Sequence, residues 1–276
     1  MYVCVSLSLY LTTAPLVRGP YGPNNKVMKP LKNTFTFGTE EEYEFRYVGL
    51  NIVQSPVEIK VDNNHYVKAL ELNNLSVARD LKVGDTMSEE GQTEFRSVVG
   101  KLSNLASTTR PDICFDVKIL SSKVGKATKQ DLKIAVKRLL KVKADPSEMT
   151  FPDVGPVHEW VLVGHGDAGV RSMPDKTTSV GGHIIQLCNR ETDRCCVLSW
   201  RSKKIKRKVV SSLAAEALAM VASIGELVYM TAVLTQIYGN QVNDIPRVVV
   251  TDAKNLEEAV KSTSLVEDPW LIPMSP

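Results

Sequence analysis

A long apolar stretch with one charged residue constrains the fold more than any other feature. Between Val209 and Gly225, Glu216 is the only charged side chain, and apolar residues lie on nearly every side of it. This pattern predicts a long helix over residues 213–238 that packs within a domain. An ionised carboxylate in such surroundings is costly unless a cation compensates it. Glu216 is therefore a candidate metal ligand. The alternative is a place in the first helical turn after Ser211 and Ser212, where the helix dipole favours an anion by about 0.3–1 kcal/mol.

The residues around this helix predict a mixed sheet. Strands are expected over 160–165, 179–188 and 195–200 before it, and a strand over 247–251 and a helix over 256–261 after it. Three strands in series followed by helix, strand and helix are typical of a mixed sheet with helices on its faces. The fold class is thus α/β (α+β).

The first half of the chain has a different pattern. Residues 45–54, 57–61 and 66–67 predict a β-hairpin or meander. Helices are expected from Glu94, over 112–124 and over 130–142, because apolar residues recur at helical spacing. The apolar faces comprise Phe95, Val98, Val99, Leu102 and Leu105 in the first helix, and Leu132, Ala135, Val136, Leu139 and Leu140 in the third.

Breaks in the pattern predict three segments. Pro146 and the FPDVGP segment at 151–156 place a boundary near residue 150. We expect a leader or linker over 1–33, one domain over 34–150 and a second over 151–276. Residues 2–17 are apolar, but no Lys or Arg precedes them and Ser and Thr interrupt them, so a secretory signal is not favoured. No other segment is expected to reach the roughly 20 apolar residues of a membrane helix, so no membrane partner is predicted.

Two further carboxylates fall at the ends of predicted strands. The strand WVLVGHGD alternates, so Val161, Val163, His165 and Asp167 share a face. Asp252 ends the strand RVVVTD. Each has a structural alternative: Asp167 in an Asp-Ala-Gly turn, and Asp252 as the N-cap of the next helix. Together with Glu216, the two aspartates offer the oxygen ligands that Mg²⁺ or Mn²⁺ prefers. Two such ions about 4 Å apart can clamp the attacking and leaving oxygens of a phosphodiester.

A basic run lies between the last of the three strands and the long helix. It has no acidic residue and consists of RSKKIKRK, with the cations Arg201, Lys203, Lys204, Lys206, Arg207 and Lys208. Such a run is either a solvated face or a phosphate-binding surface beside the acidic residues. Net charge is only +3, so a preference for nucleic acid has to come from local clusters of this kind.

Cysteines and histidines give little further chemistry. The five cysteines have irregular spacing, which does not predict a disulfide framework and favours an intracellular location, cytoplasmic or nuclear. His183, Cys188, Cys195 and Cys196 do not have the spacing of a zinc site, and strand or turn positions are expected for them.

The motifs as a set resemble a known family. FRSVVGKLSNLASTTRPDICFDV, DLKIAVKRLLK, VGHGDAGV, KTTSVGGHII, VLSWRSKKIKRKVVSSLAAEALAM and VVVTDAKNLEEAV follow one another over about residues 35–266. In this order they are similar to the C-terminal part of the polyprotein of copia-type LTR retrotransposons. The resemblance implies the end of a reverse-transcriptase palm and a thumb in the first half. In the second half it implies a ribonuclease H domain with a mixed five-stranded sheet. It also implies metal-binding roles for Asp167, Glu216 and Asp252, and a helix at 129–143 that tracks template and primer, where the residues alone suggest an amphipathic surface helix.

Two departures from the family qualify its function. Residues 1–39 contain no Asp or Glu, so polymerase activity is not expected of this chain. The family also has a fourth acidic or histidine metal ligand, for which Asp268 is the nearest carboxylate without a clear match. The leading hypothesis is a ribonuclease H-type endonuclease that cuts RNA–DNA hybrids with Mg²⁺ or Mn²⁺. The alternative is a catalytically inactive remnant that binds nucleic acid or has no activity.

Overall fold

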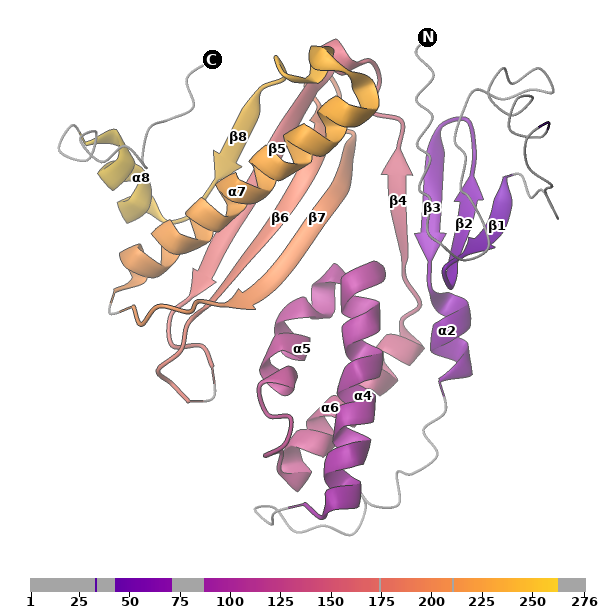
Figure 1. The fold of residues 1–276 in the computed structure, drawn as a ribbon, viewed down its shortest axis with the longest axis vertical. Coiled ribbons are helices and arrows are strands. Elements are labelled where there is room, and N and C mark those ends of the chain that lie inside the picture. The colour runs from indigo at the N-terminus through magenta and orange to yellow at the C-terminus, as the bar shows by residue number, and fades with distance from the viewer. Residues whose placement is uncertain (1–32, 34–42, 71–86, 174, 210, 263–276) are drawn as a thin grey trace.

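The computed structural model describes residues 33, 43–70, 87–173, 175–209 and 211–262. The predicted leader or linker, apart from Asn33, and Asp268 lie outside these ranges. The described part contains two four-stranded sheets and a group of helices (Figure 1). The mixed α/β class expected from the sequence is confirmed.

The first sheet is antiparallel, in the order β1-β2-β3-β4. Its strands are β1 (Glu44–Tyr47), β2 (Leu50–Gln54), β3 (Glu58–Asp62) and β4 (Glu148–Pro152). The predicted meander is present, although residues 45–54 form two strands around a turn at Val48 and Gly49. Because β4 pairs with β3, the boundary predicted near residue 150 falls inside a strand of this sheet.

One predicted strand is a helix. Tyr66 and Val67 belong to α2 (Asn64–Ala69), not to the sheet. The Asp62 carboxylate accepts a hydrogen bond from the backbone N–H of Asn64 at 2.7 Å, which turns the chain after β3. Val67 is buried in the helical core, so tertiary packing overrides the strand preference of this short apolar pair.

The helical core is close to the predicted one. It contains α4 (Glu89–Thr108), a 3₁₀ turn (Pro111–Ile113), α5 (Cys114–Ser121) and α6 (Lys129–Ala144). All five apolar residues predicted for the first helix are buried in it. In α6, however, Leu140, which was expected on the apolar face, is 46% exposed. Val142 is buried in the core instead. A capping box between Thr128 and Asp131 fixes the start of α6.

The second sheet has the order β7-β6-β5-β8. Its strands are β5 (Trp160–Gly169), β6 (Val180–Asn189), β7 (Cys195–Lys204) and β8 (Arg247–Val250). β6 is antiparallel to β5 and β7, and β8 is parallel to β5. The resemblance implied five strands, and the described residues contribute four. The short helix α8 (Lys254–Lys261) follows β8.

The long helix α7 (Ser212–Tyr238) crosses one face of this sheet (Figure 1). Ala219, Ser223 and Leu227 are buried against the strands. By length and composition α7 is also apolar enough to cross a membrane, contrary to the expectation that no segment beyond residues 2–17 would be. The expectation counted uninterrupted apolar residues, and α7 reaches the required composition despite two glutamates.

Two cysteines are joined. Cys188 and Cys195 lie opposite each other on β6 and β7 and form a disulfide, which the irregular cysteine spacing did not predict. Sequence spacing missed this pair because it depends on strand register. Cys114 and Cys196 do not take part in this disulfide.

Candidate metal centre

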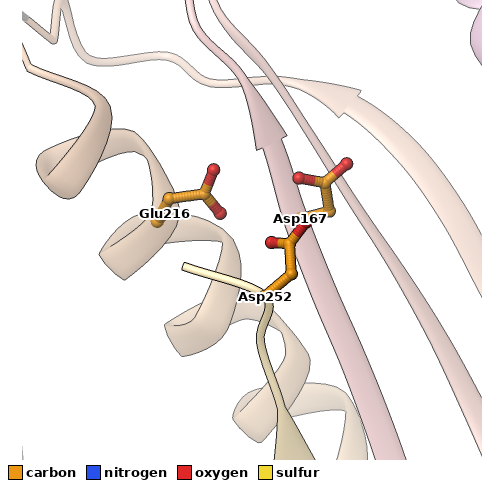
Figure 2. Close-up of side chains that lie close together, drawn as sticks. All are labelled: Asp167, Glu216 and Asp252. Atoms are coloured by element: carbon orange, nitrogen blue, oxygen red, sulfur yellow. The ribbon is translucent and has the colours of Figure 1, made fainter. Parts of the chain in front are cut away.

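Three carboxylates converge at one end of the second sheet (Figure 2). Asp167 comes from β5, Glu216 from α7, and Asp252 from the segment after β8. One ligand oxygen from each lies within 4.8 Å of the other two. Asp167 and Asp252 are exposed and Glu216 is half-buried. The structure thus brings together the three residues that the sequence singled out.

The structural alternatives for these residues are wrong. Asp167 is not in a turn, because β5 continues to Gly169. Asp252 does not cap α8, whose N-cap is Ala253 without a side-chain hydrogen bond. Glu216 lies beyond the first turn of α7, which starts at Ser212 and has no acidic residue in that turn.

The alternation of buried and more exposed residues along β5 sets the direction of the Asp167 side chain. Every second residue from Trp160 to Ala168 is buried and the intervening ones are less so, as the sequence predicted. On the buried side, Gly164 and Gly166 let α7 approach the strand closely. A Cβ at Gly164 would lie 2.7 Å from Ser223 Oγ and 2.9 Å from Leu227 Cδ1. A Cβ at Gly166 would lie 3.3 Å from the carbonyl oxygen of Ala219. This contact holds the first turns of α7, and with them Glu216, near Asp167.

The three carboxylates lie close enough to repel one another. Burial raises the pKa of Glu216, and the charges of Asp167 and Asp252 raise it further, while a hydrogen bond from the backbone of Ala168 lowers it. Glu216 Oε2 is buried and has no hydrogen-bond partner among the residues that the structure describes. A buried anionic oxygen without a partner, facing two more carboxylates, suits a hard divalent cation. The residues therefore fit Mg²⁺ or Mn²⁺.

The basic run occupies a strand as well as a loop. Arg201, Lys203 and Lys204 belong to β7, which is longer than predicted, and Lys206, Arg207 and Lys208 follow it. All six side chains are exposed. Ser202 lies opposite Gly182, which itself lies opposite Asp167. The run is thus on the neighbouring edge of the same sheet, two strands from the carboxylates.

The set of cysteines and His183 does not form a metal site in the described part of the chain. His183 and Cys188 are on β6, and Cys195 and Cys196 are on β7, as expected. Only the acidic trio has metal-ligand geometry among the described residues. His183 is nevertheless only 9% exposed, and its Nε2 has no hydrogen-bond partner within the described ranges. Sequence reasoning did not detect this orphaned nitrogen, because it depends on which strand lies beside β6.

A mixed sheet crossed by one long helix, with three convergent carboxylates at its end, defines the class as an α/β protein with a candidate divalent-cation site. Comparisons with known proteins bear on its origin. The chain is 27% identical over 219 residues to the retrovirus-related Pol polyprotein from transposon RE1 of Arabidopsis thaliana. It is 33% identical over 146 residues to that from transposon RE2 of the same plant. These matches confirm the resemblance to a retrotransposon polyprotein.

The matches cover different shares of the proteins. They include 75% and 52% of this chain but only 14% and 9% of the RE1 and RE2 polyproteins, so the chain spans a small part of these relatives. No family model matches the chain. A foamy viral protease-reverse transcriptase, solved in complex with an RNA/DNA hybrid, has a TM-score of 0.44 and 11% identity over 96% of this chain and 34% of its own.

Proposed function

We propose that the chain is a retroelement-derived endonuclease of ribonuclease H type, which hydrolyses the RNA strand of RNA–DNA hybrids. The single observation that supports this most is the convergence of Asp167, Glu216 and Asp252 within 4.8 Å on three separate elements. The similarity to Pol polyproteins supports a nucleic-acid substrate.

Each residue has a role in this proposal. Asp167, Glu216 and Asp252 hold Mg²⁺ or Mn²⁺, which supplies charge neutralisation for phosphodiester hydrolysis. Glu216 would contribute Oε2, which is buried and has no hydrogen-bond partner among the described residues. Arg201, Lys203 and Lys204 on β7 bind backbone phosphates and position the strand relative to the carboxylates. Lys206, Arg207 and Lys208 extend this cationic surface.

A cleavage assay with a matched control tests the proposal. The full chain is incubated with an end-labelled RNA–DNA hybrid in Mg²⁺ or Mn²⁺, beside Asp167→Asn and Asp244→Asn. Asp244 is an exposed aspartate in a turn of the same half and lies outside the trio. We expect Asp167→Asn to lower the cleavage rate about 100-fold or more, and Asp244→Asn to leave it unchanged.

The other outcomes separate the two hypotheses. Cleavage that persists in Asp167→Asn would assign the activity to something other than this site. A chain that binds the hybrid without cutting it, in either metal, would support the alternative of an inactive nucleic-acid-binding remnant. Parallel reactions with RNA and DNA duplexes establish whether the hybrid is preferred.

A further inference from the structure

A cavity of about 350 Å³ lies beside α7, next to strands β6 and β7. It is separate from the three carboxylates, none of which lines it. Five of the six cations of the basic run do line it: Arg201, Lys203, Lys204, Lys206 and Arg207. The basic run therefore borders a concave surface and is not only a solvated strand edge.

The helical wall of the cavity is apolar and has little bulk. Leu218, Ala222 and Gly225 recur at helical spacing and line it. Ala222 and Gly225 are exposed, and a Cβ at Gly225 would meet nothing within 4 Å. A wall of this kind offers a surface against which a flat or ring-shaped group can lie.

The lining also contains two polar side chains outside the basic run, His183 and Glu226. His183 is more than nine-tenths buried, and its Nε2 has no hydrogen-bond partner in the part of the chain that the structure describes. Burial lowers the pKa of His183, and Arg201 opposite it on β7 acts in the same direction, while Glu226 raises it. Glu226 Oε1 accepts a hydrogen bond from Ser199 Oγ at 2.7 Å. His183 and Glu226 thus both line the cavity, and they are the two polar side chains of its lining that are not part of the basic run.

The cavity is close enough to the carboxylates to share one strand of nucleic acid with them. Asp167 pairs with Gly182, which lines the cavity and pairs in turn with Ser202. Two steps between neighbouring strands amount to about 10 Å. At a rise of about 3.4 Å per nucleotide, that distance corresponds to roughly three nucleotides along a duplex strand.

We propose that this cavity binds one nucleotide of a nucleic-acid strand. The phosphate lies on Arg201 and Lys203, and the sugar or base lies against Ala222 and Gly225. His183 and Glu226 supply the other polar side chains of the lining. The inference rests on the proposed function, because the strand is the one that passes the acidic trio, but it concerns binding and not cleavage.

Filling the cavity without changing its charge tests this assignment. Ala222→Leu places bulk in the cavity, and Ala232→Leu makes the same change at an exposed position of α7 that does not line it. The full chain and both variants are titrated against a fluorescent RNA–DNA hybrid in EDTA, with anisotropy as the readout. We expect Ala222→Leu to raise Kd about tenfold, Ala232→Leu to leave it unchanged, and Arg201→Gln to reduce the salt slope of log K by about one.

The result that would overturn the inference is equal affinity for wild type and Ala222→Leu. Should Ala222→Leu melt at a lower temperature than wild type, Gly225→Leu replaces it, since that position has open space around it. Because EDTA prevents cleavage, this outcome is independent of the Asp167→Asn assay. A chain can fail either test and pass the other.

A second readout identifies the ligand chemistry. The imidazole signal of His183, assigned by its loss in His183→Gln, is followed by NMR during titration with adenosine monophosphate or with inorganic phosphate. Movement with the nucleotide at concentrations where phosphate has no effect supports a nucleotide site. Equal movement with both would contradict it and reduce the cavity to a general anion site.

Discussion

Trp200 on β7 donates its indole N–H to the backbone carbonyl of Ala106 in α4, with 2.7 Å between the heavy atoms. The same carbonyl accepts a hydrogen bond from the Cys114 thiol. This contact joins the second sheet to the helical core, two parts that are far apart in sequence. This hydrogen bond therefore joins the two halves of the chain, in addition to β4, which spans the boundary predicted near residue 150.

Trp200→Phe tests whether that anchor couples the halves. The change keeps an aromatic ring but removes the donor, so we expect a loss of about 1 kcal/mol in the free energy of unfolding. Hydrogen exchange should become faster at the end of α4, over residues 102–108. Trp160→Phe is the matched control, because the Trp160 indole donates to Gly155 within the second half, at 2.9 Å. Equal acceleration in α4 for both variants would argue against a specific anchor.

Binding of a divalent cation should stabilise the chain through Glu216. At Mg²⁺ concentrations tenfold above Kd, linkage adds about 1.4 kcal/mol, which corresponds to a rise of a few degrees in Tm. Glu216→Gln should lose this response. In metal-free buffer at neutral pH it should melt above wild type, because it removes a half-buried charge that faces two others.

The control for that measurement is Glu226→Gln, which neutralises the other glutamate of α7 outside the trio. It should respond to Mg²⁺ as wild type does. If Glu216→Gln were stabilised by Mg²⁺ as strongly as wild type, the cation would bind elsewhere.

Acid should weaken the helical core through Asp112. Arg110 is buried and donates two hydrogen bonds of 2.8 Å to the Asp112 carboxylate, which holds the pKa of Asp112 below its ordinary value. The stabilisation is therefore present above about pH 4, the unfolded-state value, and is lost as pH falls through the folded-state pKa. We expect Asp112→Asn to cost about 1 kcal/mol at pH 6 and to show a smaller further loss down to pH 2.5, measured by urea unfolding. Parallel curves for variant and wild type over this range would contradict the assignment.

Local patterns predicted most of the fold because they depend on neighbours in sequence. The buried stripe of α4 recurs at helical spacing, and the alternation of β5 encodes which residues face α7. The exception was α2, where Tyr66 and Val67 have strand propensity but the turn after Asp62 and packing on the helical core form a helix.

The three carboxylates of the site were predictable from the sequence, but the residues around them were not. Asp167 and Asp252 follow runs of strand residues, and Glu216 is conspicuous in an apolar helix, so sequence alone singled them out. The cavity beside His183 and the Cys188–Cys195 disulfide arise from cross-strand register. No periodicity within a single segment specifies that register.

Gly164 and Gly166 of β5, which α7 approaches closely, have a consequence for sequence comparison. One extra methyl group at Gly164 would lie 2.7 Å from Ser223 Oγ and 2.9 Å from Leu227 Cδ1, so these two side chains of α7 would have to shift. Comparison of related sequences should therefore include Gly164 and Gly166 beside Asp167, Glu216 and Asp252, because both glycines set how closely α7 approaches β5.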